Sequence, residues 1–239
     1  MIAIMKFEYQ KENIEMAVND YHIAIEMMKE NNFYEHWLLE FIQRNFSGGT
    51  FVDAGANTGN HSVFFNKFCN CKVIAIEPVK ESFFMLVNNI WNNINRNGES
   101  PAYDDHKMLV YNVAISEKID KAYMSIPDPK EQSIGGSKLS ASGDQRTDIT
   151  TLDELLKNEQ DIKLIKIDVE GHEVQALIGG LETIKKHKPE IFIETFDKFE
   201  IIDFMLMSLQ IGYELKERYC HAPVYHFSTN ENIPVTFKK

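Results

Sequence analysis

The chain has 239 residues, a hydrophobic share of 44% and a formal net charge of -11. One domain with terminal additions is the expected organisation at this length, and the apolar share is sufficient for a packed core. The acidic balance disfavours nucleic acid as a partner, because binding to it depends on neutralising phosphates. The sequence also contains no apolar stretch of the roughly 18–20 residues that a membrane span requires.

The N-terminal residues are predicted to be helical. Apolar side chains recur across 12–46, among them Ile23, Met27, Leu38 and Phe41. We expect these helices to form an extension over 1–48 that flanks the core or covers a ligand cleft. Residues 49–239 are predicted to form one α/β domain, in which strands and helices alternate.

A glycine turn between a strand and a helix is the most informative local pattern. The apolar run at 50–53 predicts a strand, and the apolar pattern at 59–68 predicts a helix. Gly55 and Gly59 between them permit a tight turn that brings backbone N–H groups close to a ligand. Strand, glycine turn and helix in this order form the first unit of a nucleotide-binding α/β fold.

The residues around this turn argue against a dinucleotide. The dinucleotide fingerprint has glycine at its second position, where the backbone meets a pyrophosphate, but this chain has Asn57 after Ala56. Asp53 precedes the turn, and its carboxylate would repel a pyrophosphate while attracting an α-ammonium group. The pattern therefore favours S-adenosylmethionine, which carries an ammonium, a sulfonium and a ribose but no phosphate.

The next two strands supply further candidate cofactor contacts. A strand predicted at 72–76 ends at Glu77 and Pro78, about 20 residues after the turn, where an acidic residue suits a ribose diol. A helix is predicted near 80–94, a loop at 95–107 and a strand at 108–114. Asn112 and Ala114 at the end of that strand would lie beside an adenine ring, although they could equally be an ordinary strand end.

The segment 127–149 is rich in glycine, proline and serine and follows a strand predicted at 121–126. Loops of this length within a compact domain are usually functional or disordered. We interpret the segment as a lid, with disorder or simple linkage as the alternative. Thr151 is a plausible N-cap for a short helix, because Glu154 follows at capping-box spacing.

A second set of polar residues follows the strand predicted at 162–168. Lys166, Asp168 and Glu170 alternate with apolar residues, so they share one face for as long as the chain stays extended. His172 continues this register if the turn allows it. Because ligands in such sheets bind beyond the carboxyl ends of the strands, we favour catalysis or acceptor positioning. A structural salt-bridge set and a metal site remain the alternatives.

The last elements complete the predicted sheet. A helix is expected over 172–185, a strand over 190–195 and a helix over 197–210. Glu194 at the end of that strand is expected to face the same cleft, with an ordinary loop acid as the alternative. Two apolar segments near 211–218 and 222–228 suggest an antiparallel hairpin. The predicted fold is α/β, with a doubly wound, mostly parallel seven-stranded sheet of Rossmann type, a C-terminal antiparallel hairpin and N-terminal helices.

Three segments together resemble the FkbM family of S-adenosylmethionine-dependent methyltransferases. They are the glycine turn with Asn57, the tripeptide Thr151-Leu152-Asp153, and the run "KIDVEGHE" that begins at Lys166. The resemblance covers about residues 50–195, and the last segment is its most specific part. It implies methyl transfer to a hydroxyl oxygen, in a family whose members act on sugars of surface glycans and on natural products such as macrolides.

The residues expected to function divide into two groups. By motif, the glycine turn would hold the amino-acid part of the cofactor, Glu77 its ribose, and Asp168 with Glu170 would line the reaction cleft. The candidate cofactor-binding residues are Asp53, Gly55, Ala56, Asn57, Gly59, Glu77, Pro78, Asn112, Ala114 and Asp168. The candidate catalytic residues are Lys166, Asp168, Glu170, His172 and Glu194.

The expected function is O-methylation of a sugar or glycan-type acceptor, with a nucleotide sugar or polysaccharide precursor as examples. The alternatives are O-methylation of a natural product and a catalytically silent cofactor-binding subunit of a partner. A homo-oligomer is possible, and no resident metal is assigned. An odd count of three cysteines without a disulfide framework suggests reduced thiols and a cytoplasmic location.

Overall fold

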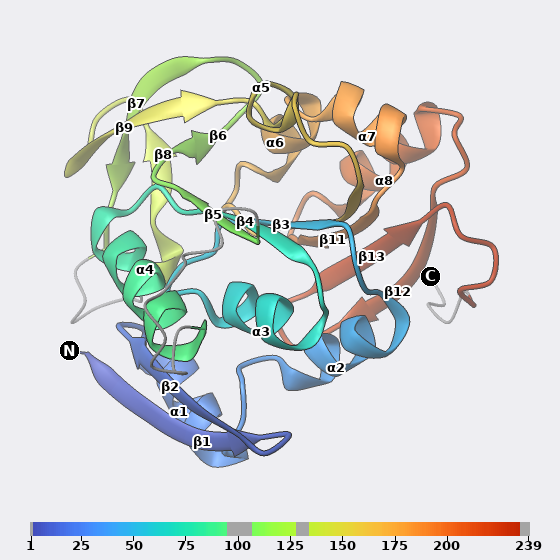
Figure 1. The fold of residues 1–239 in the computed structure, drawn as a ribbon. Helices are drawn as coiled ribbons and strands as arrows, with labels where there is room; N and C mark the ends of the chain where they lie inside the picture. Colours follow the sequence, from blue (N-terminus) through green and yellow to red (C-terminus); the bar gives the residue numbers. More distant parts are fainter. Residues whose placement is uncertain (1, 95–106, 128–133, 235–239) are drawn as a thin grey trace.

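The computed structural model describes residues 2–94, 107–127 and 134–234. In these residues the main feature is a seven-stranded sheet with the strand order β12-β13-β11-β10-β3-β4-β5 (Figure 1). Its strands are β3 (Thr50–Ala54), β4 (Lys72–Ile76), β5 (Met108–Tyr111), β10 (Ile162–Ile167), β11 (Glu190–Glu194), β12 (Glu214–Tyr219) and β13 (Val224–Ser228).

The sheet is mixed. The five neighbouring strands β5, β4, β3, β10 and β11 run parallel to one another. β13 and β12 form the predicted antiparallel hairpin, which pairs with β11. The expectation of a mostly parallel sheet with a C-terminal hairpin is therefore confirmed. The sheet is not a purely doubly wound one, because the hairpin reverses direction within it.

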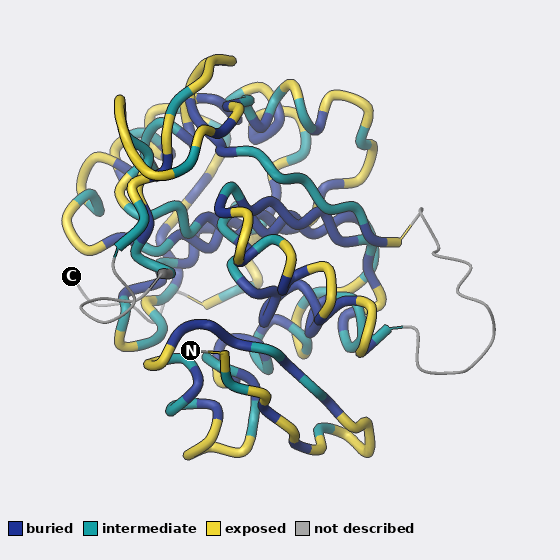
Figure 2. Tube along the Cα trace, turned by 90° about the vertical axis from the view of Figure 1, so that its left-hand side faces the viewer, coloured by how far each residue is buried: buried dark blue, intermediate teal, exposed yellow. Residues whose placement is uncertain are grey.

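Helices cover both faces of the sheet. The hydrophobic core on one face includes residues of α1 (Tyr21–Glu30), α2 (His36–Asn45), α3 (Asn60–Phe68) and α4 (Lys80–Ile94). The core on the other face includes residues of α5 (Leu152–Leu156), α6 (Glu173–Ile178), α7 (Leu181–His187) and α8 (Phe199–Ser208). The central strands β3, β4, β10 and β11 are largely buried (Figure 2), which explains their apolar runs.

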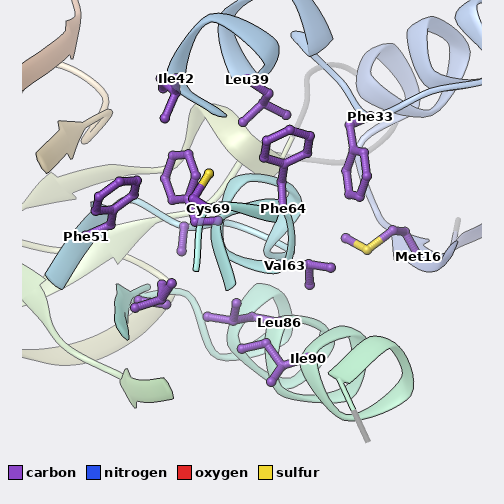
Figure 3. Packing of buried hydrophobic residues seen from close by; sticks show 14 of the residues in the cluster. Met16, Phe33, Leu39, Ile42, Phe51, Val63, Phe64, Cys69, Leu86 and Ile90 are labelled. Atoms are coloured by element: carbon purple, nitrogen blue, oxygen red, sulfur yellow. The ribbon is translucent and has the colours of Figure 1, made fainter. Parts of the chain in front are cut away.

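The alternation of side chains along β3 shows how the two apolar cores arise. Phe51 lies in the core on the α1–α4 face, whereas Val52 lies in the core on the α5–α8 face. On the first face, Phe33 and Phe64 meet edge to face at a centroid distance of 5.2 Å, with Met16 beside them (Figure 3). Residues before the sheet therefore share one core with it.

The N-terminal prediction is only half correct. Helices α1 and α2 are present, but β1 (Ala3–Tyr9) and β2 (Glu12–Val18) form an antiparallel hairpin before them. Ile14, Met16 and Val18 are buried at every second position, the period of a strand. The expectation of helix from residue 12 onward was wrong because it overlooked this alternation.

Two elements within the α/β domain also differ from the prediction. The strand expected at 108–114 is divided, because β6 (Ala114–Ile115) leaves the main sheet and pairs with a different one. The helix expected at 172–185 is two helices, α6 and α7, separated at Gly179 and Gly180. A Cβ at Gly179 would overlap the carbonyl oxygen of Ser116, so glycine is required by a close backbone approach.

Much of the predicted lid is regular structure. In the described residues, a four-stranded sheet with the order β6-β9-β7-β8 includes β7 (Asp120–Ser125), β8 (Lys138–Ser140) and β9 (Gln145–Thr150). A short 3₁₀ turn, η1 (Ile134–Gly136), precedes β8, and residues 128–133 lie outside the described part. The prediction that Thr151 caps α5 is confirmed, since its hydroxyl accepts a hydrogen bond from the Glu154 N–H at 3.0 Å.

Candidate active site

A cavity of about 550 Å³ opens at the carboxyl ends of the parallel strands. Gly55, Glu77 and Asp168, which follow β3, β4 and β10, line it together with Glu194, the last residue of β11. Parallel sheets bind ligands at this edge, because the chain turns away from the sheet there and leaves a crevice. Residues at the ends of four separate strands are therefore brought together at one place.

The glycine turn after β3 is shaped by two close approaches. Gly55 has a φ of +86°, and a Cβ there would overlap the carbonyl oxygen of Asp168 on the neighbouring loop. Gly59, at φ +90°, lies against the side chain of Leu86. The N–H groups of Gly55 and Ala56 both donate to the Ile76 carbonyl at 2.9 Å, which ties the turn to β4.

Asp53 lies beneath this turn and is fully buried. One carboxylate oxygen accepts a hydrogen bond from the Ser62 hydroxyl of α3 at 2.6 Å. Its other oxygen, Oδ1, is buried without a hydrogen-bond partner in the described part of the chain. A buried acceptor in this condition is costly, so it marks a position where a donor from outside the protein would be favourable.

Glu77 at the end of β4 is also buried, and its carboxylate accepts two backbone hydrogen bonds. The donors are the N–H of Asn57 at 2.8 Å and the N–H of Val79 at 2.7 Å. Burial nevertheless raises the pKa of Glu77 to about 7, because it outweighs the lowering by the two N–H groups; the nearby Asp168 and Asp53 carboxylates make smaller contributions that also raise this pKa. A carboxylate has about four acceptor sites, so it can still receive ribose hydroxyls.

Lys166 is the cation at the base of the cavity. Its ammonium group lies 2.9 Å from Asp168 Oδ2, and its side chain is 2% exposed. Burial alone would lower the pKa of Lys166, but the surrounding carboxylates, led by Asp168 and Asp53, raise it above its ordinary value. The parallel register sets Lys166 beside Asp53 on β3, which explains how this cluster forms.

Glu170 and Glu194 are carboxylates with raised pKa values. Burial, followed by repulsion from Asp168, raises the pKa of Glu194 to about 8 and that of Glu170 to about 7. Glu170 has a φ of +48°, so the extended register expected to continue from Lys166 ends before it. It reaches the cavity through a left-handed turn, and it still lies close to Asp168.

His172 is placed at the start of α6, where its Nε2 lies 3.0 Å from the Ser116 hydroxyl. Burial lowers the pKa of this imidazole, which favours the neutral form near pH 7. In the described residues, no group of three His, Cys, Asp or Glu side chains is arranged to hold a metal ion.

A family comparison adds to this geometry. Residues 53–216 match the family model described as the methyltransferase FkbM domain, which is well over half of the chain. The chain belongs to the FkbM methyltransferase family. The resemblance drawn from the glycine turn and the "KIDVEGHE" run is thereby confirmed, and no curated protein sequence matches the chain.

A solved structure of another FkbM methyltransferase has the same fold. The FkbM methyltransferase of Methylobacillus flagellatus KT aligns with a TM-score of 0.56 at 20% identity, over 77% of this chain and 44% of that one. The chain thus spans less than half the length of that FkbM protein. A precorrin-6y C5,15-methyltransferase from Geobacter metallireducens GS-15 aligns with a TM-score of 0.47 at 13% identity, covering 81% and 86% of the two chains.

The FkbM chain brings most of its candidate residues to the cavity. The lining includes Gly55, Asn57, Glu77, Pro78, Ala114, Asp168, Glu170, His172 and Glu194. Five candidates lie behind that lining rather than in it: Asp53, Ala56, Gly59, Asn112 and Lys166. Asn112 donates from its side-chain amide to the carbonyl oxygens of Glu77 at 2.8 Å and Pro78 at 3.1 Å, so it holds the turn after β4.

Sequence analysis expected the N-terminal extension to flank the core or cover a ligand cleft, but it named no functional residue in the segment between α1 and α2. Tyr34 lines the cavity, and its backbone exchanges two hydrogen bonds with the side chain of Asn60 at the start of α3. The Glu35 carboxylate lies 3.2 Å from His61 Nε2. Both residues precede the matched family domain, so no motif identified them; the excess of apolar residues around them indicated only packing.

Proposed function

We propose that this FkbM protein is an S-adenosylmethionine-dependent O-methyltransferase that acts on a hydroxyl of a sugar or glycan-type acceptor. The observation that carries the proposal is the convergence of the glycine turn and three carboxylates, Asp168, Glu170 and Glu194, on one cavity. The turn suits the cofactor, and the carboxylates suit a hydroxyl-rich acceptor. The cytoplasmic location and a possible homo-oligomer remain predictions; no helix in the described residues is long and apolar enough to cross a membrane.

The residues around the turn fit S-adenosylmethionine. Gly55 leaves no Cβ at the point where the backbone approaches Asp168, and the Asp53 carboxylate, directly behind the lining, would attract the α-ammonium group of the cofactor. Glu77 has remaining acceptor sites for the ribose. When bound there, the cofactor supplies an electrophilic methyl group on its sulfonium.

The chain's own contribution is to position the acceptor and remove its proton. Alignment of the hydroxyl oxygen with the methyl carbon makes the largest contribution to the rate of such a displacement. The acceptor oxygen becomes a better nucleophile when its proton moves to a base, which is worth roughly 10²–10⁴-fold. We assign this role to Glu194, since its carboxyl has a pKa of about 8 and Asp168 is already paired with Lys166.

Calorimetry with S-adenosylhomocysteine tests the cofactor assignment. We expect Asp53→Asn and Glu77→Gln each to weaken its binding at least about tenfold, which is roughly 1.4 kcal/mol. Asp120→Asn, at an exposed position on β7, is the matched control and should bind as the wild type does. Unchanged affinity in both site variants would reject the assignment, as would tighter binding of NAD.

Turnover tests the assignment of the base. Labelled S-adenosylmethionine with a panel of sugars and glycans should give transfer whose rate rises with pH up to about 8, the pKa of Glu194. Glu194→Gln should lower turnover at least about 100-fold and remove this dependence, while S-adenosylhomocysteine affinity stays within about threefold. Cofactor binding without transfer to any hydroxyl would instead indicate a silent subunit.

A further inference from the structure

The lining of the cavity is strongly acidic. Five carboxylate residues border it, namely Asp20, Glu77, Asp168, Glu170 and Glu194. Within the described ranges, no lysine or arginine side chain contributes to that lining, and its other titratable side chains are Tyr34 and three histidines. A phosphate group entering this space would meet like charges from several elements, while the cation behind the lining, Lys166, is already paired with Asp168.

Three of these carboxylates already have partners, and two do not. Asp20 caps α1 by accepting from two backbone N–H groups, Glu77 accepts from two others, and Asp168 pairs with Lys166. For Glu170 and Glu194, the described residues provide no hydrogen bond or ion pair. Lys138 lowers the pKa of Glu170, and Lys166 lowers the pKa of Glu194. In both carboxyls, burial and the charge of Asp168 raise the pKa by more than these cations lower it.

Two aromatic side chains, Tyr34 and Phe196, also border the cavity, an observation independent of charge. Tyr34 comes from the α1–α2 connection, where its ring meets His22 at a centroid distance of 6.3 Å. Phe196 follows β11 two residues after Glu194 and is 75% exposed, although it borders the cavity. Aromatic faces attract ammonium groups and pack against the C–H faces of sugar rings. Both the floor and the walls thus favour a cationic, hydroxyl-bearing ligand.

We propose that the acceptor is a polyol that carries a free amino group, bound as the ammonium ion beside Glu170 and Glu194, and that phosphate-bearing acceptors are excluded. This inference rests on the proposed methyltransferase function and narrows its substrate class. The amine supplies the positive charge that Glu170 and Glu194 lack, and the reacting hydroxyl lies on the same molecule. The nucleotide sugars that sequence analysis offered as examples do not suit such a cavity.

Binding to the full-length protein, saturated with S-adenosylhomocysteine, tests the proposal by calorimetry at pH 7. The probes are a glucosamine tetramer, the matched tetramer with every amine N-acetylated, and glucosamine 6-phosphate. We expect the free-amine tetramer to bind at least about tenfold more tightly than the N-acetylated one, and the phosphate to bind most weakly. Because the two carboxyls have pKa values of about 7 and 8, binding of the ammonium ion should release protons to the buffer.

Variants separate this site from general attraction to an acidic protein. Glu170→Gln and Glu194→Gln should each reduce the preference for the free amine at least about threefold while leaving S-adenosylhomocysteine affinity intact. Glu200→Gln, at an exposed position on α8 outside the lining, is the control and should leave the preference for the free amine unchanged.

Three outcomes would overturn the inference: equal affinity for the two tetramers, binding of neither, or a preference for the phosphate. Absence of S-adenosylhomocysteine binding is a separate result that refutes the proposed function itself. Cofactor binding without an amine preference refutes only the substrate class.

Discussion

The ammonium group of Lys166 is nearly inaccessible to solvent, and the carboxylates of Asp168, Asp53, Glu35 and Glu194 surround it. An isolated charge at this depth would be very unfavourable, so the lysine is stable there only because of these neighbours. The same lysine allows acidic groups to gather beside a ligand cavity. Sequence analysis could predict that a lysine among carboxylates would be paired, but not that Glu35 would join from outside the motif.

Removing this cation should destabilise the protein. Lys166→Met keeps a long side chain but leaves the buried carboxylates unpaired, which costs about 3–5 kcal/mol. Lys163→Met on the same strand, β10, is the control, since Lys163 is exposed and should change stability by no more than about 0.5 kcal/mol. Chemical denaturation at pH 7 measures the free energy of unfolding of both variants. The loss of stability in Lys166→Met should be smaller at lower pH, because the carboxylates take up protons. Equal effects of the two substitutions would contradict the electrostatic role.

Gly55 gives a second prediction at the scale of one residue. In Gly55→Ala the new Cβ would meet backbone of the Asp168 loop, which cannot rotate away. Gly212→Ala is a matched control, because Gly212 has a similar φ of +93° and open space around it. Both variants carry backbone strain of about 1–3 kcal/mol. We expect only Gly55→Ala to lower S-adenosylhomocysteine affinity at least about tenfold, measured by calorimetry; a similar loss in both would mean that strain alone is responsible.

At the scale of elements, two asparagines on α4 attach the N-terminal hairpin to the domain. Asn89 exchanges hydrogen bonds with both backbone groups of Ala17 at 2.7 and 2.8 Å, and Asn93 does the same with Glu15 at 2.9 and 2.8 Å. Residues 15 and 17 are two positions apart on β2, and residues 89 and 93 are about one helical turn apart on α4. The two amides therefore form the hydrogen bonds that a neighbouring strand would form with β2. The free edge of β2 is satisfied by side chains rather than by another strand.

Removing these amides should loosen the hairpin and leave the main sheet intact. In the double variant Asn89→Ala/Asn93→Ala, four buried backbone and side-chain interactions with β2 are lost. Hydrogen exchange at Glu15 and Ala17 should accelerate at least about tenfold, whereas protection of β3 and β10 is retained. Asn88→Ala, exposed on the same helix, should leave both regions protected. Uniform loss of protection would indicate that the hairpin is part of the global folding unit.

The elements also show which patterns could be predicted from sequence. β3, β4, β10 and β11 were found because buried parallel strands are continuous apolar runs between helices. The β1–β2 hairpin was missed because its alternation lies within a polar segment, and β8 and β9 because glycine and proline around them suggested a loop. The hairpin is a local pairing, from Ala3 with Val18 to Tyr9 with Glu12, so its alternation was readable in the sequence. β8 and β9 pair with β7 and β6, and local patterns do not record such pairing.

At the scale of the whole molecule, the N-terminal extension and the α/β domain together line a cavity that concentrates negative charge. Three of its carboxyls have pKa values raised by burial: Glu77 and Glu170 to about 7, and Glu194 to about 8. Ionising such groups is less favourable in the folded state than in the unfolded chain. The arrangement that prepares the site for a cationic ligand therefore lowers the stability of the empty protein.

The stability of the ligand-free protein should consequently depend on pH in a defined direction. Because the folded-state pKa values are raised, the carboxyls contribute most to the stability of the folded protein below their unfolded pKa of about 4.3. This contribution is lost as pH rises through 7 to 8.

The double variant Glu170→Gln/Glu194→Gln tests this dependence, because glutamine is neutral at every pH. Its melting temperature should exceed that of the wild type by about 2–4 °C at pH 8.5, the change expected from about 1 kcal/mol, and match it at pH 4. The control Glu200→Gln, exposed on α8, should follow the wild type throughout. A double variant less stable than the wild type at pH 8.5 would show that Lys166 holds both glutamates as favourable partners, and the proposal of an unsatisfied acidic pair would then fail.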